Sequence, residues 1–247
     1  MAPIVYLVSG ANRGIGLGLV TSLVLRPDVV VFAGARNPAA ASDLKALQNQ
    51  YPGKLHIVKL TSAERADNEA AIAEIKRTTG KLDVVIANAG IAKFWGTILN
   101  TPLDEMREHW EVNVIGPTVL FQSAWPLLKA APKPEFAIIT SIAASIAAGA
   151  VLPAGFLAYG ASKTGANFLG MKLHSEHAEL VVALIHPGPV ETEMGNFARD
   201  EDPVIREALT FISVEESVAG ILKLVDGAKR DADGPKMIGF DGTIFPW

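Results

Sequence analysis

Short apolar runs alternate with longer segments of helical spacing along the whole chain, and this alternation constrains the fold more than any other feature. Each run has about the length of a strand and is continuously apolar, which is typical of strands buried on both faces. Strands that alternate with helices predict a parallel sheet with helices on both faces. The expected strands span residues 4–9, 29–34, 55–60, 82–87, 136–140 and 180–186. The clearest helical segments span residues 14–25, 41–50, 66–79, 103–129, 157–179 and 214–229.

Length and composition fit one domain of this kind. The 247 residues lie within the range of a single α/β domain. Hydrophobic residues make up 49% of the chain and charged residues 19%, so the chain can bury a large core. We therefore expect residues 1–247 to form a single domain. Residues 192–213 are the least regular part of the sequence and are expected to form a flap.

Charge and cysteine content exclude several functional classes. The net charge of −4, with no basic face implied, argues against a nucleic-acid partner. The chain has no cysteine, which excludes disulfides, thiolate zinc sites and iron–sulfur clusters. His174 and His177 are three residues apart, but no third ligand is evident nearby, so no metal site is predicted.

One apolar stretch, residues 136–159, is long enough to span a bilayer and contains no charged residue. Ser145, Pro153 and Gly155 interrupt any helix there, so a buried strand that leads into an apolar cleft is the preferred interpretation. The first ten residues carry no basic segment and only a short apolar run, so no signal peptide is predicted. We expect a cytoplasmic protein without a membrane partner.

A glycine-rich turn follows the first expected strand. Gly10, Gly14 and Gly16 are spaced G-x3-G-x-G between that strand and the first expected helix. Glycine allows a sharp turn and a close approach to a ligand, and the N-terminus of the following helix attracts an anion. The context of the turn predicts a site for the pyrophosphate of a dinucleotide.

The end of the second expected strand indicates which dinucleotide binds. A free ribose 2′-hydroxyl usually meets Asp or Glu there, whereas this chain has Ala35-Arg36-Asn37. Arg36 and Arg13 could pair with a 2′-phosphate, because guanidinium groups match phosphate geometry. The alternative is that both arginines are solvated surface residues. The sequence favours NADP(H) over NAD(H).

Polar residues that suit proton transfer are expected near the same edge of the sheet. Tyr159 and Lys163 are four residues apart, so both project from one helix face. A neighbouring ammonium lowers the pKa of a phenol, which makes the pair a candidate general acid and base. The alternative is a surface pair on an amphipathic helix. Ser141 follows the strand 136–140, and Asn113 stands in a helical segment, where asparagine is a poor helix former.

Together these motifs resemble the short-chain dehydrogenase/reductase family over essentially the whole chain. The matching segments are Gly10-Ala11-Asn12-Arg13-Gly14-Ile15-Gly16, Asn88-Ala89-Gly90, Asn113, Ser141, Tyr159-x3-Lys163 and Pro187-Gly188. The final segment, Phe240-Asp241-Gly242-Thr243 with Pro246-Trp247, is similar to the subgroup of C-factor-like and sniffer-like carbonyl reductases and fungal norsolorinic acid ketoreductases. The resemblance implies a Rossmann-like, doubly wound α/β fold with about seven parallel strands.

The resemblance also implies an activity, the interconversion of a hydrophobic ketone or aldehyde and its alcohol with NADP(H). Tyr159 would exchange a proton with the substrate oxygen, and Lys163 would hold the nicotinamide ribose and lower the pKa of Tyr159. Ser141 would orient the substrate oxygen, and Asn113 would hold a water that links Lys163 to solvent. Cofactor contacts are expected for Gly10, Asn12, Arg13, Gly14, Ile15, Gly16, Arg36, Asn37, Leu60, Thr61, Asn88, Ala89, Gly90, Tyr159, Lys163, Pro187, Gly188, Val190 and Thr192.

The sequence departs from the family pattern after the third expected strand. Family members commonly have an Asp there that contacts adenine, but Leu60 is followed by Thr61-Ser62, and no Asp occurs before Asp67. Recognition of adenine is therefore expected to be looser or to use backbone groups. Ser9 and Ala87 replace a Thr and an Asn of the family motifs, and both are small changes.

The substrate cleft is expected to be apolar, which suits a bulky or aromatic carbonyl compound. Its expected walls are Phe94, Trp95, Ser141, Ile142, Val151, Leu152, Phe156, Met194 and Phe197, with residues 192–213 as the substrate flap. The resemblance further implies a homodimer or homotetramer built partly from the segments 103–129 and 157–179. An alternative function is a catalytically idle NADP(H)-binding protein with a regulatory or interaction role.

Overall fold

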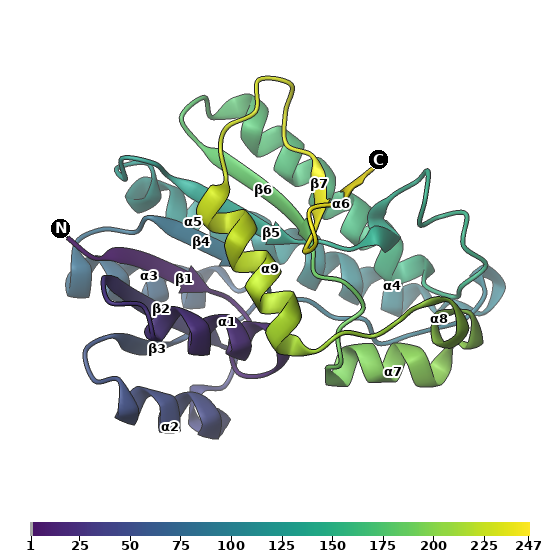
Figure 1. Cartoon of the computed structure of the whole chain (residues 1–247), viewed down its shortest axis with the longest axis horizontal. Coiled ribbons are helices and arrows are strands. Elements are labelled where there is room, and N and C mark those ends of the chain that lie inside the picture. The colour runs from purple at the N-terminus through teal and green to yellow at the C-terminus, as the bar shows by residue number, and fades with distance from the viewer. Residues whose placement is uncertain (1) are drawn as a thin grey trace.

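The computed structural model describes residues 2–247 and confirms the predicted doubly wound α/β architecture (Figure 1). Its strands form one sheet in the order β3-β2-β1-β4-β5-β6-β7-β8, in which every neighbouring pair is parallel except the last. The strands are β1 (Ile4–Val8), β2 (Val29–Ala35), β3 (Leu55–Lys59), β4 (Val84–Ala87), β5 (Glu135–Ile139), β6 (Val181–His186), β7 (Met237–Gly239) and β8 (Ile244–Phe245). The helices are α1 (Gly14–Val24), α2 (Ser42–Gln50), α3 (Arg65–Thr79), α4 (Leu103–Trp110), α5 (Gly116–Leu128), α6 (Leu157–Glu176), α7 (Glu193–Glu201), α8 (Pro203–Ala208) and α9 (Val214–Gly227).

Helices cover both faces of the sheet. One core contains Leu23 of α1 and Ile221 of α9, and the other contains Ile75 of α3 and Leu128 of α5; all four side chains are fully buried. Successive residues of a strand point to opposite faces, so strands between two helical layers need apolar residues at nearly every position. This requirement explains the unbroken apolar runs. Each fully buried Leu or Ile contributes about 1.5–3 kcal/mol to folding.

The strand order reverses beside β1, which pairs with β2 on one side and β4 on the other. Because these strands are parallel, their carboxyl ends meet at the same edge of the sheet. Ligands of open α/β sheets bind in the crevice at such a reversal. The fold therefore brings the glycine-rich turn after β1 next to the residues that follow β4.

The helical segment expected over residues 103–129 is not one continuous helix. α4 ends at Trp110, a π-helical turn spans Glu111–Ile115, and α5 begins at Gly116. Asn113 lies buried in this turn. A π turn adds a residue to the helix and often marks a functional site, which agrees with the poor helix propensity of asparagine at this position.

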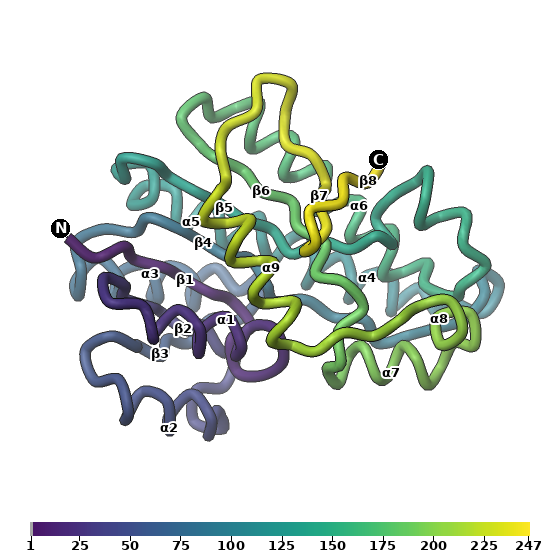
Figure 2. Tube along the Cα trace, viewed as in Figure 1, coloured from purple at the N-terminus to yellow at the C-terminus, as the bar shows by residue number. Residues whose placement is uncertain are grey.

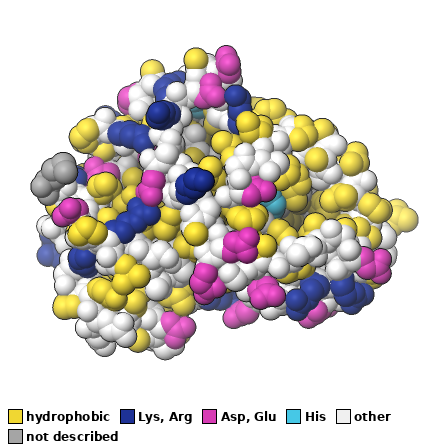
Figure 3. Space-filling model, in the orientation of Figure 1, with side chains coloured by type: hydrophobic (Ala, Val, Ile, Leu, Met, Phe, Trp, Pro, Cys, Tyr) yellow, Lys and Arg dark blue, Asp and Glu magenta, His cyan; other side chains and the backbone are white. Residues whose placement is uncertain are grey.

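Four elements near the carboxyl end of the sheet were not located from the sequence. The segment 192–213 contains the helices α7 and α8, and the chain ends in the short antiparallel pair β7–β8. Charged side chains gather along α7, and hydrophobic ones gather beyond it around the loop after β5 (Figure 3). The C-terminal end lies beside this loop, where the N–H of Ala147 donates to the carbonyl of Trp247 at 3.0 Å (Figure 2).

The uncharged stretch 136–159 forms most of β5, the loop that follows it and the first residues of α6. In residues 2–247 we find no helix that combines the length and the hydrophobicity needed to cross a membrane.

Glu135 is a buried carboxyl group at the amino end of β5, on the edge of the sheet opposite the crevice. It is 2% exposed, and its nearest cation is the Nζ of Lys133 at 3.7 Å. Burial raises the pKa of Glu135 from 4.5 to about 7. The folded state therefore holds this proton more tightly than the unfolded chain does. The resulting stabilisation is complete below about pH 4.5 and is lost as the pH rises through about 7.

We expect the Glu135→Gln variant to be more stable than the parent at alkaline pH, because it removes the cost of an ionised buried group. The gain in the free energy of unfolding should be roughly 1–3 kcal/mol at about pH 8 and should disappear at about pH 5. Urea unfolding of both proteins at the two pH values measures this difference. A gain that does not depend on pH would contradict the ionisation of Glu135 as its cause.

Candidate active site

The glycine-rich turn after β1 is tied to the end of β4 by Ser9 and Asn88. The hydroxyl of Ser9 accepts hydrogen bonds from the backbone N–H groups of Asn88 and Ala89, each at 3.0 Å. In return, the side-chain amide of Asn88 donates to the carbonyls of Ser9 at 2.9 Å and Gly10 at 3.2 Å. Ser9 thus supplies the small hydroxyl that the position requires. These hydrogen bonds fix the backbone that follows β1 and β4 at the base of the crevice.

Two glycines of the turn cannot be replaced without displacing backbone. Gly10 adopts a positive φ of 63°, and a Cβ there would lie 2.8 Å from the Cα of Ala89. A Cβ on Gly16 would lie 2.2 Å from the carbonyl oxygen of Gly10 and 2.6 Å from the Nδ2 of Asn88. The turn therefore has no room for a side chain at either position.

The N-terminus of α1 faces outward from this turn without an internal partner. Arg13 occupies the N-cap position but makes no capping hydrogen bond, and the first turn of α1 contains no acidic residue. The free N–H groups and the helix dipole favour an anion at this place. The arrangement fits the pyrophosphate of a dinucleotide, which Gly14, Ile15 and Gly16 would face with backbone N–H groups.

The two arginines expected to mark the cofactor differ in their surroundings. Arg36 follows β2 beside Asn37; both are exposed, and no ion pair engages Arg36 within residues 2–247. Arg13 is also exposed, as is Asn12, but its guanidinium pairs with the carboxylate of Glu193 at the start of α7. Glu193 was not expected near the glycine turn. Exposed ion pairs are worth little, about 0–1 kcal/mol, so Arg13 can exchange this partner for a phosphate.

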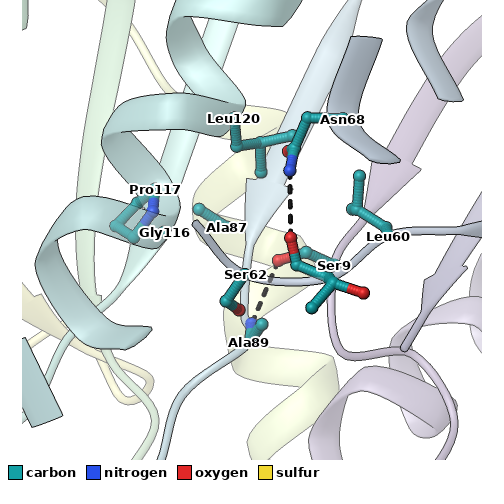
Figure 4. A pocket seen from close by; sticks show the side chains of 10 residues that line it. Ser9, Leu60, Ser62, Asn68, Ala87, Ala89, Gly116, Pro117 and Leu120 are labelled. Atoms are coloured by element: carbon teal, nitrogen blue, oxygen red, sulfur yellow. Dashed lines mark hydrogen bonds between the residues drawn. The ribbon is translucent and has the colours of Figure 1, made fainter. Parts of the chain in front are cut away.

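The region after β3 contains a carboxylate after all, although not at the end of the strand. Asp67 of α3 pairs with the Nζ of Lys59 at 3.0 Å, and a hydrogen bond with Thr61 is the main cause that lowers the pKa of Asp67. Asn68 donates to the carbonyl of Thr61 at 3.0 Å. Leu60 and Thr61 line a small pocket with Ser9, Asn68, Ala87 and Ala89 (Figure 4). The carboxylate near Thr61 thus comes from Asp67 of the following helix, α3, rather than from the end of β3.

Tyr159 and Lys163 lie on one face of α6, as their spacing predicted. The Nζ of Lys163 is 5.9 Å from the centre of the Tyr159 ring and donates to the carbonyl of Ile139, at the end of β5, at 2.8 Å. Burial lowers the pKa of Lys163 to about 8. A Cβ on Gly90 would be 3.3 Å from the Nζ of Lys163, so the residues after β4 reach the same place.

The expected lowering of the pKa of Tyr159 is not observed in this structure. Burial raises the pKa of the phenol, and only a hydrogen bond with the side chain of Ser141 opposes that rise. The physical reason is that the ammonium of Lys163 is held by the carbonyl of Ile139 rather than by the phenol, while Tyr159 is half-buried and its phenol is partly desolvated.

Ser141 begins the loop after β5 and is 9% exposed. Its hydroxyl accepts from the N–H of Ala143 at 3.2 Å and interacts with the phenol of Tyr159. The N–H of Ile142, the next residue, donates to the Nδ1 of His186 at 3.3 Å. Burial lowers the pKa of His186 to about 4, so this imidazole is neutral near pH 7 and can accept that bond. His186 supports the Ser141 turn, a role that its place at the end of a strand did not suggest.

Asn113 joins three parts of the site. Its Oδ1 accepts from the N–H of Ile91 at 2.9 Å, and its Nδ2 donates to the carbonyl of Ile91 at 3.0 Å. The same Nδ2 donates to the hydroxyl of Ser162 at 2.9 Å, which in turn donates to the carbonyl of Tyr159 at 2.7 Å. The side chain therefore holds the loop after β4 against α6. The expected hold of Asn113 on a water that links Lys163 to solvent stays a prediction.

The segment after β6 passes over the glycine turn. The carbonyl of Pro187 accepts from the hydroxyl of Ser217 at 2.6 Å, and Gly188 has a positive φ of 84°. Val190 is buried, and Thr192 caps α7 by accepting from the N–H of Gly195 at 3.1 Å. A Cβ on Gly14 would lie 3.2 Å from the Cγ2 of Thr192, so this segment covers the start of α1. These residues surround the same crevice.

Several residues expected to line the substrate cleft belong to an apolar cluster that includes Tyr159. This cluster consists of Trp95, Ala143, Leu152, Ala154, Phe156, Tyr159, Ala198, Ile205, Leu209 and Phe211. Four of its members, Ala198, Ile205, Leu209 and Phe211, come from the flap and had no periodic signal in the sequence. Phe94 covers Gly96 next to Trp95, and Ile142 is half-buried. The structure does not bring Val151, Met194 or Phe197 into the cluster; Val151 is 71% exposed.

Comparisons with known proteins agree with this arrangement. The family model described as short chain dehydrogenase matches residues 4–203. A norsolorinic acid ketoreductase of Dothistroma septosporum is 38% identical over 256 residues, which cover 98% of this chain and 92% of that protein. An uncharacterized oxidoreductase of Schizosaccharomyces pombe is 35% identical over 252 residues and 98% of both chains. The structure of an NADPH-bound carbonyl reductase from chicken fatty liver superposes with a TM-score of 0.87 at 32% identity over the whole of both chains.

Proposed function

Because this chain belongs to the short-chain dehydrogenase family, we propose that it is an NADPH-dependent carbonyl reductase that acts on a hydrophobic ketone or aldehyde. The observation that carries the proposal is the meeting of Ser141, Tyr159 and Lys163 beside the glycine turn. A protein that only senses a dinucleotide does not need a half-buried phenol next to a hydroxyl group and an ammonium.

Each polar residue of the site has a role in this reaction. Bound NADPH supplies the hydride that adds to the carbonyl carbon. Tyr159 donates its phenolic proton to the carbonyl oxygen, which becomes the alcohol oxygen, and the phenol then regains a proton from solvent. Ser141 donates a hydrogen bond to the same oxygen and fixes its position. Lys163 stabilises the transient phenolate and binds the ribose hydroxyls, for which its Nζ would turn away from the carbonyl of Ile139.

Asn113 acts through geometry in this proposal. By tying Ile91 to Ser162, it fixes the distance between the loop after β4 and the helix that carries Tyr159. That loop includes Gly90, where a Cβ would lie 3.3 Å from the Nζ of Lys163. Asn113 therefore holds the loop after β4 against the helix that carries both Tyr159 and Lys163.

The proposal takes NADP(H) as the cofactor. Arg36 follows β2, at the position where an acidic residue would select the free ribose of NAD(H), and Arg13 of the glycine turn would join it at the 2′-phosphate by leaving Glu193. The similar carbonyl reductase from chicken fatty liver was crystallised with NADPH, which supports the same choice. The polar group proposed to contact adenine is Thr61, which interacts with Asp67, the partner of Lys59.

We expect the Arg36→Ala variant to lose preference for NADPH. Removing a charge-assisted pair with the 2′-phosphate should raise the KM for NADPH roughly 10-fold or more while leaving the KM for NADH almost unchanged. Steady-state rates with both cofactors measure the ratio. Equal KM values for NADPH and NADH in the parent, unchanged in the variant, would refute the choice of NADP(H).

Substrate, assembly and location complete the proposal. The apolar cluster around Trp95 and Phe156 suits a bulky or aromatic carbonyl compound.

On the outer sides of α4 and α6, the large side chains Leu103, Trp110 and Phe168 are 69%, 47% and 69% exposed, which supports a homodimer or homotetramer that covers them. The enzyme is proposed to work in the cytoplasm.

A panel of ketones and aldehydes, followed by the loss of NADPH absorbance, tests the proposal. We expect turnover of bulky and aromatic ketones and little turnover of small charged oxoacids. The competing function, an idle NADP(H)-binding protein, predicts that NADPH binds and changes its fluorescence while no carbonyl compound is reduced. NADPH binding without turnover across the whole panel would therefore overturn the enzymatic assignment.

A further inference from the structure

Asp202 is a buried carboxylate between the two helices of the flap. The residue is 7% exposed, and no ion pair includes it within residues 2–247. Burying a carboxylate is costly unless hydrogen bonds compensate for lost water. Its Oδ1 accepts from the N–H groups of Val204 at 2.8 Å and Ile205 at 3.4 Å, which caps α8. Capping uses only one of the two oxygens, so the second is available for another task.

The second carboxylate oxygen of Asp202 accepts a hydrogen bond from outside the flap. Its Oδ2 accepts from the backbone N–H of Gly155 at 2.7 Å. Among the hydrogen bonds of residues 2–247, this is the one that joins the segment 193–213 to the loop 142–156. Hydrogen bonds to an ionised acceptor are shorter and stronger than neutral ones. The flap is thus attached to the loop by a single strong polar contact.

Gly155 also contacts a third segment, the loop that contains Gly96. Its carbonyl accepts from the N–H of Gly96 at 2.7 Å, and Gly96 forms a bridge with Phe156. A Cβ on Gly155 would lie 2.5 Å from the nitrogen of Gly96, so the two backbones are in direct contact. Trp95, next to Gly96, packs edge-on against Phe156 at 5.9 Å between ring centres. Asp202, Gly155 and Gly96 therefore hold three segments together around one apolar cluster.

The apolar cluster between these segments includes the reacting phenol of Tyr159. Phe156 is the N-cap of α6, three residues before Tyr159, and it belongs to the same apolar cluster as Trp95 and Ile205. The indole Nε1 of Trp95 is buried there without a hydrogen-bond partner. A shift of the flap away from Gly155 would open this cluster to water on the side where a substrate would lie.

We propose that Asp202 is a positioning residue for the substrate, which holds the flap α7–α8 on the loop 142–156 and so keeps the apolar cluster around Tyr159 closed to water. The inference rests on the proposed carbonyl reductase function. The contact acts on the carbonyl substrate and not on the dinucleotide, because it lies at the far end of the flap from Thr192 and the glycine turn. Its loss should raise the KM for the ketone and leave the dissociation constant of NADPH unchanged.

Two variants separate the contact with Gly155 from the capping of α8. Asp202→Ser keeps a short oxygen that can cap the helix, but that oxygen is too short to reach Gly155 as well. Asp202→Ala loses both contacts. We expect both variants to raise the KM for an aromatic ketone roughly 10-fold or more. Only Asp202→Ala should also lower the melting temperature appreciably, because a lost cap destabilises the helix.

Hydrogen exchange followed by mass spectrometry provides a measurement that does not depend on turnover. The amide of Gly155 should be protected in the parent protein and exchange faster in Asp202→Ser, whereas the amides of β5 should be unchanged. A parental KM in Asp202→Ser together with a raised KM in Asp202→Ala would show that capping alone matters and would overturn the proposal. Unchanged exchange at Gly155 in Asp202→Ser would overturn it as well. An inactive parent protein would refute the proposed function, while the exchange measurement would still decide whether Asp202 holds the flap.

Discussion

Replacing Tyr159 with Phe is expected to lower kcat for ketone reduction roughly 10²–10⁴-fold, the range that a positioned general acid contributes. The variant removes only the hydroxyl, and its ring can remain in the apolar cluster with Phe156 and Trp95. The fold and the dissociation constant of NADPH should therefore change little. Stopped-flow absorbance for the chemical step and fluorescence titration for NADPH measure the two quantities separately.

Ser141→Ala is the matched control for this result. It removes a hydroxyl from the same contact, but it leaves the proton donor in place, so it should slow the reaction less than Tyr159→Phe does. Turnover by Tyr159→Phe at the parental rate would remove the phenol from the mechanism. A variant that loses NADPH binding along with activity would indicate that Tyr159 acts in cofactor binding instead.

The second large effect is expected at Gly16. A Cβ there would lie 2.2 Å from the carbonyl oxygen of Gly10, which is backbone and cannot rotate away. Gly16→Ala must therefore displace the glycine turn. Overpacking of this kind costs typically about 1–3 kcal/mol, and if the cost falls on the dinucleotide site, NADPH binds about 10- to 100-fold more weakly.

Gly227→Ala is the matched control, because a Cβ on Gly227 meets no atom within 4 Å. It should leave NADPH binding at the parental value. Fluorescence titration with NADPH compares the two variants, and thermal unfolding reports any damage to the fold. Parental affinity in Gly16→Ala would show that the turn does not form the phosphate site.

The sequence predicts the part of the fold that periodicity controls. Strands buried on both faces require unbroken apolar runs, and six such runs correspond to β1 to β6. The resemblance implied about seven parallel strands, but neither the seventh, β7, nor the antiparallel β8 could be located, because strands of three and two residues are too short to show a pattern. α7 and α8 escaped prediction for a different reason. Their stability depends on the caps Thr192 and Asp202 and on contacts with a distant loop, not on a long apolar stripe.

In the candidate site, too, the sequence predicted the local motifs but not the contacts between distant segments. Glycine spacing and the pair Tyr159 and Lys163 are local in the sequence, and the structure brings these residues together. Interactions between distant segments could not be read from the chain. His186 beneath the Ser141 turn and Glu193 beside Arg13 are visible only once the strands and the flap are folded.

The pKa of Tyr159 could not be predicted from residue spacing. The four-residue interval between Tyr159 and Lys163 suggested an ammonium beside the phenol, but the Nζ of Lys163 donates to Ile139. Burial then dominates and raises the pKa of Tyr159. The predicted lowering requires a rearranged Lys163 side chain, which spacing along a helix cannot specify.

Transfer of deuterium is the most direct test of the central claim, that this protein reduces a carbonyl group with the hydride of a bound nicotinamide. The protein is incubated with a turned-over aromatic ketone and NADPH that carries deuterium on the transferred position of nicotinamide C4. Mass spectrometry of the alcohol should find one deuterium on the carbinol carbon. An alcohol without deuterium, or NADPH bound tightly while no alcohol forms from any ketone, would contradict the account.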